Sequence, residues 1–162
     1  MMGEDIGRGE GLRIVPLTRA YLDEVVAIER SSFTDPWTRG MFESELSAVP
    51  TGYARGAVRG AMLIGYLFAV IIPDEAHVGN LAVHPSERGR GVAQRLLDRL
   101  IEDARSEGVR RVTLEVRETN RTARNFYYKN DFIDIAIRKN YYRSPVEDAI
   151  VMYRVLPEDP SV

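Results

Sequence analysis

Arg88-Gly89-Arg90-Gly91-Val92-Ala93 separates an apolar segment, residues 76–83, from an amphipathic segment, residues 91–107. The first segment is predicted to be a strand, and the second a helix because its apolar residues recur every three or four positions. The first amides of a helix have no intrahelical acceptor, and the helix dipole adds partial positive charge there. Glycines let an anion approach those amides, and the two arginines add local positive charge. The stretch therefore predicts a phosphate site at a helix N-terminus.

Two familiar nucleotide-binding motifs do not fit this stretch. A dinucleotide-binding fingerprint would need a small residue where Gln94 stands. A nucleoside-triphosphate P-loop would need Gly-Lys-Ser/Thr, which the stretch lacks. Taken alone, the string is also compatible with ordinary solvated arginines.

The bulk composition is that of one globular domain. The chain has 162 residues, 44% hydrophobic and 28% charged, with a formal net charge of −2. This charge predicts no nucleic-acid partner, so phosphate binding has to be local. The absence of cysteine excludes disulfides, thiolate metal sites and a cysteine nucleophile, and two histidines are too few for a histidine-only metal site. We therefore expect no metal.

The start of the chain is acidic and has no secretory pattern, and the longest apolar run, residues 61–72, is too short to cross a bilayer. We expect a cytoplasmic protein without a membrane partner. The sequence gives no indication of the oligomeric state.

Periodicity and turn residues predict a single mixed α/β (α+β) domain over residues 12–156, between tails at 1–11 and 157–162. Thr18 is the expected N-cap of the first helix, and Arg59-Gly60 the expected hairpin turn. Residues 140–147 are expected to connect the last two strands. The predicted strands are 12–16, 53–58, 62–72, 76–83, 111–116, 132–138 and 149–155, and the predicted helices 18–30, 38–46, 91–107 and 122–130.

Several motifs resemble one family. The Arg88–Ala93 string matches the Gln/Arg-x-x-Gly-x-Gly/Ala signature of the GNAT N-acetyltransferases, and Asn80-Leu81-Ala82-Val83-His84-Pro85 resembles their fourth strand. Within that family, three stretches resemble the RimI-type ribosomal-protein alanine N-acetyltransferases, and the similarity runs from about residue 12 to residue 156, nearly the whole chain. These are Ser31-Ser32-Phe33-Thr34-Asp35-Pro36-Trp37, Leu114-Glu115-Val116-Arg117-Glu118-Thr119-Asn120, and Arg138-Lys139-Asn140-Tyr141-Tyr142 with Glu147-Asp148-Ala149.

The resemblance implies a fold and a cosubstrate. The fold is a mixed, mostly antiparallel sheet whose fourth and fifth strands part, with acetyl-CoA in the gap. A backbone N–H near Leu81 is expected to stabilise the thioester carbonyl oxygen. Asn120 is expected to hydrogen-bond the cofactor, although a helix cap is the alternative for it. The other implied cofactor-binding residues are Ala82, Val83, Arg88, Gly89, Arg90, Gly91, Val92, Ala93 and Gln94.

The resemblance also implies which residues move protons. A peptide α-amine has a pKa of about 8 and must lose a proton before it attacks. Glu115 is the implied base, acting through water, and Tyr127 the implied acid for the departing thiolate. Strand alternation places Thr113, Glu115 and Arg117 on one face, but it leaves open whether that face is solvent or a cleft. For Tyr127 and its neighbour Tyr128, aromatic packing is the alternative.

Two other features qualify the resemblance. The family usually has glycine before the phenylalanine of Asn130-Asp131-Phe132, and Asn and Asp tolerate a left-handed backbone better than most residues, so the turn is expected to survive. His77 and His84 are interpreted as structural.

The implied acceptor is a protein or peptide N-terminus, with ribosomal-protein alanine as the first choice and a broader range of N-termini also open. Four residues would flank the amine: Pro36, Trp37, Tyr141 and Tyr142. The alternatives are a small-molecule amine acetyltransferase, acting on a polyamine or antibiotic, and a non-catalytic acetyl-CoA-binding module.

Overall fold

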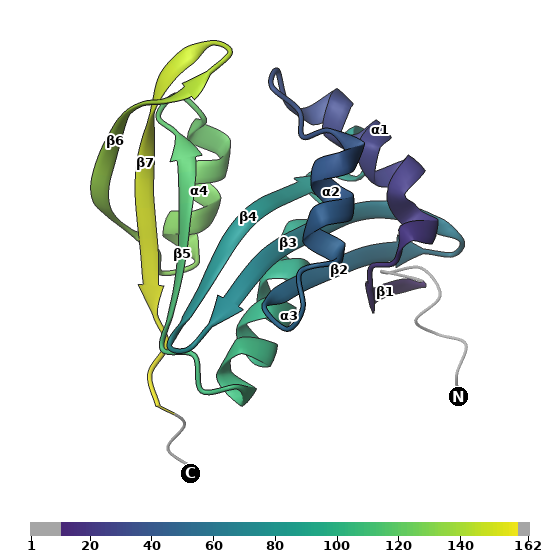
Figure 1. The fold of residues 1–162 in the computed structure, drawn as a ribbon, viewed down its shortest axis with the longest axis horizontal. Helices are drawn as coiled ribbons and strands as arrows, with labels where there is room; N and C mark the ends of the chain where they lie inside the picture. Colours follow the sequence, from purple (N-terminus) through teal and green to yellow (C-terminus); the bar gives the residue numbers. More distant parts are fainter. Residues whose placement is uncertain (1–10, 159–162) are drawn as a thin grey trace. The chain divides into compact units, whose positions relative to one another are not determined.

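The computed structural model describes residues 11–158, so most of the two predicted tails, residues 1–10 and 159–162, lies outside it (Figure 1). The described residues form seven strands, four α-helices and two 3-10 turns. In chain order these are β1 (Leu12–Pro16), η1 (Arg19–Tyr21), α1 (Leu22–Ser32), α2 (Arg39–Leu46), β2 (Gly52–Arg59), β3 (Met62–Ile72), β4 (Glu75–Val83), η2 (Pro85–Glu87), α3 (Val92–Ser106), β5 (Arg111–Arg117), α4 (Arg121–Lys129), β6 (Ile133–Arg143) and β7 (Val146–Val155).

The strands form one mixed sheet in the order β1-β2-β3-β4-β5-β7-β6. The pairs β1–β2, β5–β7 and β6–β7 are antiparallel, whereas β4 and β5, joined through α3, are parallel. The predicted α/β class is confirmed. The parallel ladder joins Glu75–Val78 to Arg111–Leu114, which is four of the nine residues of β4. The parting of these two strands stays a prediction.

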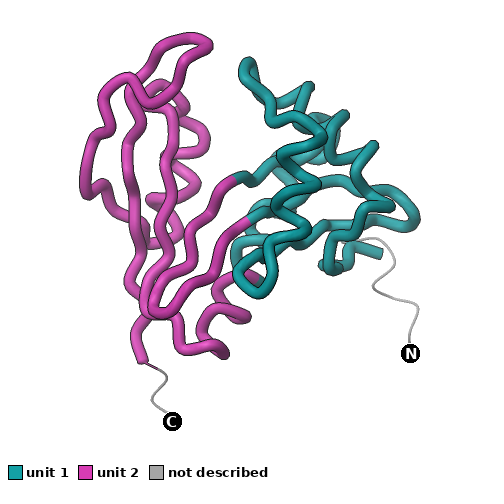
Figure 2. Tube along the Cα trace, in the orientation of Figure 1, with its two compact units in different colours: residues 1–68, 80–99 teal, residues 69–79, 100–162 magenta. Residues whose placement is uncertain are grey.

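Close contacts divide the chain into two compact units (Figure 2). The described part of the first comprises residues 11–68 and 80–99, and that of the second residues 69–79 and 100–158. Within 11–158, no helix is both long and apolar enough to cross a membrane.

The first unit is built around an aromatic core. Phe42 lies 5.1 Å from Phe68 and 5.8 Å from Tyr66 between ring centroids, and all three rings are buried. One stripe of α1 is buried as well, because Leu22, Val25 and Ile28 recur at the helical spacing; Val25 is the most fully enclosed of the three. The aromatic rings and this stripe belong to one buried cluster, which also contains Leu17, Val58, Leu63 and Ala82.

The helix starts differ from each other in their capping. The side chain of Thr38 accepts a hydrogen bond from the Met41 amide and caps α2. The predicted cap at Thr18 is wrong, since its side chain makes no cap bond and the chain enters α1 through the 3-10 turn η1. That turn satisfies Tyr21 N with the backbone oxygen of Thr18, so the side chain is not needed.

A carboxylate lies inside the first unit. Glu29 of α1 is 1% exposed, and its oxygens accept from the Tyr66 hydroxyl, from Asn80 Nδ2 at 2.8 Å and from Trp37 N at 2.9 Å. All three donors are neutral groups. They come from β3, β4 and the loop before α2, so one side chain fixes three segments to α1.

Replacing Glu29 by glutamine should cost about 1–3 kcal/mol of unfolding free energy, because the new amide N–H faces a buried donor. Urea unfolding of Glu29→Gln, compared with the exposed Glu102→Gln on α3 as a matched control, measures this cost. Equal midpoints for the two variants would show that the three donors do not need a carboxylate.

The second unit contains β5, α4, β6 and β7. As the alternation predicted, Val112, Leu114 and Val116 are buried on one face of β5, and Thr113, Glu115 and Arg117 are partly exposed on the other. The turn after α4 also behaves as predicted: Asp131 has a φ of 67°, and Phe132 N donates to Tyr127 O at 3.1 Å.

One predicted boundary is wrong. Residues 140–147 form the turn end of a hairpin rather than a loose connection, because β6 and β7 pair as far as Arg143↔Val146. A register shift between Arg138 and Tyr142 accommodates Asn140, which has a φ of 53°. Asp148 stabilises this irregular stretch by accepting from Asn140 N at 2.9 Å and from Lys139 Nζ at 3.0 Å.

Candidate active site

The glycine loop in the first unit has the geometry of an anion site. The helix α3 begins at Val92, and its first backbone bond runs from Arg95 N to Gly91 O, so the amides before Arg95 have no partner within the helix. Gly89 and Gly91 have φ values of 74° and 82°, which favour glycine, and a Cβ added at either would meet nothing within 4 Å. The loop therefore leaves open space beside the first amides of α3.

The two arginines of the loop are held differently. Arg88 Nε donates to Val83 O at 3.1 Å and its Nη2 to Ser32 Oγ at 3.0 Å, so this side chain ties the loop to the end of β4 and to α1. Arg90 is exposed, with Nη1 3.8 Å from a Glu87 oxygen. Arg90 is thus the more available of the two cations, and Arg88 positions the loop.

The polar face of β5 in the second unit carries the candidate base. Glu115 Oε2 lies 2.6 Å from His77 Nε2, and its Oε1 lies 3.6 Å from Arg138 Nη2. The Glu115 side chain is 10% exposed, against 39% for His77. The parallel register explains the contact, because His77 pairs with Thr113 and therefore lies on the face that carries Glu115.

These contacts change the proton affinities of both groups. The hydrogen bond from His77 lowers the pKa of Glu115, the charge of Arg138 lowers it further, and partial burial works in the opposite direction. The hydrogen bond to Glu115 raises the pKa of His77 above its ordinary value, against the effect of partial burial. Glu115 is therefore ionised at neutral pH, as a proton acceptor has to be.

Tyr127 and Tyr128 differ clearly. Tyr127 is buried, with its ring 5.2 Å from Phe126 and 5.3 Å from Phe132, and burial raises the pKa of its phenol well above the ordinary range. The hydroxyl of exposed Tyr128 donates to the Asp134 carboxylate at 2.9 Å and accepts from Arg124 at 3.1 Å. Tyr127 thus keeps its proton at neutral pH, while Tyr128 is engaged in a surface network.

Asn120 caps α4. Its Oδ1 accepts from Ala123 N at 3.1 Å, which is the alternative role considered for this residue. The cap uses only the side-chain oxygen of Asn120. Its Nδ2 can still donate to a cofactor, and this role stays a proposal.

The residues expected to flank the amine lie in both units. In the first, Trp37 is half-buried with its ring 5.2 Å from Phe42 and 6.2 Å from Phe68, so it anchors its loop, including half-buried Pro36, to the aromatic core. In the second, Tyr141 is 46% exposed and Tyr142 half-buried, with their rings edge to face at 5.0 Å. The structure assigns packing contacts to these residues; their contact with an acceptor stays a proposal.

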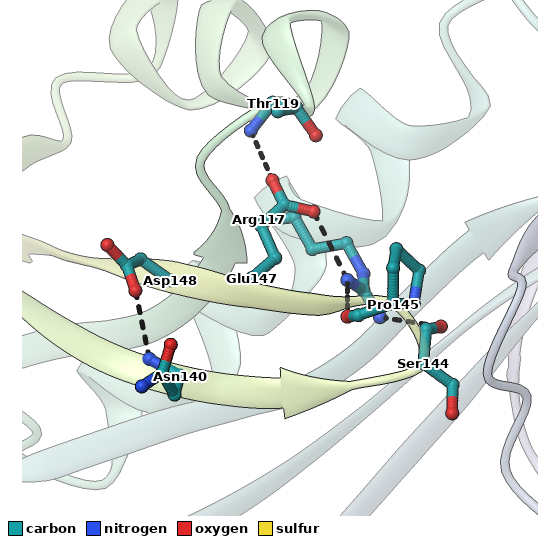
Figure 3. Close-up of polar contacts among 7 residues, drawn as sticks. All are labelled: Arg117, Thr119, Asn140, Ser144, Pro145, Glu147 and Asp148. Carbon is teal, nitrogen blue, oxygen red and sulfur yellow. Dashed lines mark hydrogen bonds and ion pairs between the residues drawn. The ribbon is translucent and has the colours of Figure 1, made fainter.

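The guanidinium of Arg117 lies 4.3 Å over the Tyr142 ring and so holds Tyr142 in place. It also donates to Glu147 Oε1 at 3.1 Å and to Pro145 O at 3.0 Å (Figure 3). The other oxygen of Glu147 accepts from Thr119 N at 2.7 Å. The contacts of Arg117 and Glu147 therefore link the end of β5 to the β6–β7 turn. Burial raises the pKa of Tyr142 to about 12.

His77 is the site residue that sequence reasoning missed. We interpreted it as structural, but the structure joins it to Glu115. The sequence did contain a signal. The strands at 76–83 and 111–116 are joined by a helix, so they are expected to pair in parallel, and strand alternation then places His77 on one of the two faces of the sheet. The register that brings it to Glu115 was not readable from spacing.

Comparisons with known proteins agree with this geometry. A family model described as acetyltransferase (GNAT) family matches residues 22–132, more than half of the chain. The N-alpha-acetyltransferase RimI of Mycobacterium tuberculosis is 36% identical over 151 residues, covering 90% of this chain and 93% of that protein. The [ribosomal protein bS18]-alanine N-acetyltransferase of Haemophilus influenzae is 32% identical over 133 residues, covering 80% and 89%.

Solved structures show the same fold. The ribosomal-protein-S18-alanine N-acetyltransferase of Escherichia coli superposes with a TM-score of 0.84 at 27% identity, covering 91% of this chain and 96% of that one. With the family model and the relatives above 30% identity, this likeness establishes that the chain belongs to the acetyltransferase (GNAT) family.

Proposed function

We propose that this acetyltransferase moves the acetyl group of acetyl-CoA to the N-terminal α-amine of a protein, with a ribosomal-protein alanine as the leading acceptor. The observation that carries the proposal is the carboxylate of Glu115 on the polar face of β5, held by His77 and Arg138, in the same unit as the buried phenol of Tyr127. A proton acceptor and a proton donor at these positions match the two transfers that the reaction requires. The names of the relatives support the choice of acceptor.

The fit of acetyl-CoA rests on the glycine loop. The open space beside Gly89 and Gly91, the first amides of α3 and the exposed Arg90 suit a pyrophosphate. Residues 88–94 would hold this part, with Asn120 as a further donor, and the backbone of Leu81, Ala82 and Val83 would hold the arm that carries the thioester. When bound, acetyl-CoA supplies the activated acetyl group.

The residues of the chain do the rest in a ternary complex. Glu115, through a water molecule, takes the proton from the attacking ammonium, so that the neutral amine forms the new N–C bond. A backbone N–H near Leu81 donates to the carbonyl oxygen as negative charge develops there. Tyr127 gives its proton to the departing sulfur as the S–C bond breaks, and it regains a proton from solvent afterwards. The nitrogen loses its second proton to solvent as the amide forms. No covalent acyl-enzyme is needed, and most of the rate comes from holding the amine and the thioester together.

The acceptor side of the proposal uses four aromatic or cyclic residues. Four residues are proposed to contact the first residues of the peptide: Pro36 and Trp37 of the first unit, and Tyr141 and Tyr142 of the second. Arg117 would act indirectly, because it fixes Tyr142. A cytoplasmic location and a single catalytic domain over residues 12–156 belong to the same proposal.

A panel of acceptors tests the proposal. Hexapeptides with free N-termini, beginning with alanine or with other residues, are compared with polyamines and aminoglycosides by thiol release. We expect the best peptide to exceed every free amine in kcat/KM by about tenfold or more, since the peptide backbone adds binding that an amine lacks. Turnover of a polyamine alone would contradict the proposal. A protein that binds acetyl-CoA but turns over no amine would be a binding module.

A further inference from the structure

We propose that His77 controls the availability of Glu115: as an imidazolium it keeps the carboxylate in an ion pair, and as a neutral imidazole it leaves the carboxylate free to accept the proton of the amine. His77 is a positioning residue, since it acts through Glu115. The inference rests on the proposed function and adds a regulating group to the same site.

The contact between His77 and Glu115 is short, and Glu115 is the more buried of the two side chains. His77 Nε2 and Glu115 Oε2 are 2.6 Å apart, slightly closer than the roughly 2.7–2.9 Å of charge-assisted N–H···O bonds, so the two groups are in direct contact. Glu115 is 10% exposed, so its carboxylate has little water to replace that partner, whereas His77 at 39% exposure exchanges protons with solvent. A change in the charge of the His77 imidazole therefore changes the proton affinity of the nearly buried Glu115 carboxylate.

The surrounding charges favour the ion pair. Glu75, two residues before His77 on β4, adds a second negative charge that supports the imidazolium, and Arg138 of β6 opposes it while also holding Glu115 Oε1 at 3.6 Å. Tyr142 of β6 also faces Glu115 and stays neutral below its pKa of about 12. With Arg138 on one oxygen and an imidazolium on the other, both oxygens of Glu115 are engaged by cations.

The proton balance follows from these contacts. Before turnover, the imidazolium loses its Nδ1 proton to solvent and keeps the Nε2 proton in the bond to Oε2. Glu115 then faces a neutral donor on that side, so its basicity rises and it accepts one proton from the ammonium through water. After transfer, Glu115 returns this proton to solvent. No other reactant is needed.

The predicted pH dependence has a definite sign. The pKa of His77 is raised, so the ion-paired form dominates below that pKa and the active form above it. kcat should therefore fall as the pH drops through the pKa of His77, in a range where Glu115 itself is still ionised because its own pKa is lowered.

A titration isolates the group. The chain has only two histidines, so in His84→Gln the one remaining imidazole signal belongs to His77. We expect its pKa by NMR to lie above about 6.5 and to fall by about one unit when Glu115→Gln is added. A value that does not respond to Glu115→Gln would overturn the inference.

The kcat profile tests the consequence. Between pH 8 and pH 6, kcat of the parent enzyme and of His84→Gln should fall by about fivefold or more, and kcat of His77→Gln by less than about twofold, because glutamine keeps a donor without titrating. The comparison uses the change of kcat with pH and not the absolute value of kcat in each variant. Identical profiles for His77→Gln and His84→Gln would overturn the inference.

The outcomes separate this inference from the proposed function. The profile is measured with whichever amine turns over best, so a polyamine acceptor would contradict the proposed function while still testing His77. Peptide acetylation with unchanged His77→Gln profiles would leave the proposed function intact and remove the inference. No turnover with any amine would overturn both.

Discussion

Glu115→Gln is expected to lower kcat at pH 7 by about 10²–10⁴-fold, the usual range for losing a positioned proton acceptor. Glutamine has nearly the same shape and can still hydrogen-bond His77, so the polar face of β5 should stay in place. The affinity for acetyl-CoA should change by less than about twofold, since no cofactor contact is assigned to this side chain. Steady-state kinetics and calorimetric titration with acetyl-CoA measure the two quantities.

The loss should also depend on pH in a specific direction. Above about pH 9 the α-amine is already neutral in solution, so the reaction needs a base less. The ratio of kcat between the parent enzyme and Glu115→Gln should therefore become smaller there. Glu118→Gln is the matched control, because Glu118 is exposed just beyond β5 and has no assigned role. A Glu115→Gln enzyme that keeps more than about a third of kcat at pH 7 would show that solvent alone deprotonates the amine.

Tyr127→Phe is expected to lower kcat by about 10²-fold, at the low end of the range for general acids because a thiol with a pKa near 8.5 is a fair leaving group. The change removes only the hydroxyl and keeps the ring between Phe126 and Phe132. The melting temperature should therefore change little. kcat and thermal unfolding of the same preparation separate a chemical loss from a structural one.

The neighbouring tyrosine gives an internal comparison. Tyr128→Phe breaks the surface bonds to Asp134 and Arg124, so we expect a small loss of stability and a kcat within about twofold of the parent. Equal losses of kcat in the two variants would mean that Tyr127 contributes packing rather than a proton.

Much of this site was predictable because local rules determine it. The Arg88–Ala93 loop precedes a helix because two glycines with positive φ turn the backbone just before an amphipathic segment. Glu115 faces away from Leu114 and Val116 because strands alternate. Asp131 replaces the expected glycine in a left-handed turn, as its residue type allows.

The remaining features depend on contacts distant in sequence. His77 reaches Glu115 only through the register of a parallel pair, which spacing does not reveal. The β6–β7 turn is contacted by Arg117 of β5, which donates to Pro145 O, and the spacing of the sequence does not reveal this contact. The interior position of Glu29 requires three donors from three segments, and composition alone favours solvent for a glutamate.

Mass spectrometry of one product shows which amine receives the acetyl group. The acceptor is a hexapeptide that begins with alanine, has a free N-terminus and carries one internal lysine, so an α-amine and a side-chain amine compete in the same molecule. We expect acetyl on the α-nitrogen, with the lysine unmodified, and loss of this product in Glu115→Gln. Acetyl on the lysine, or no acetylated peptide while a free polyamine is acetylated, would contradict it.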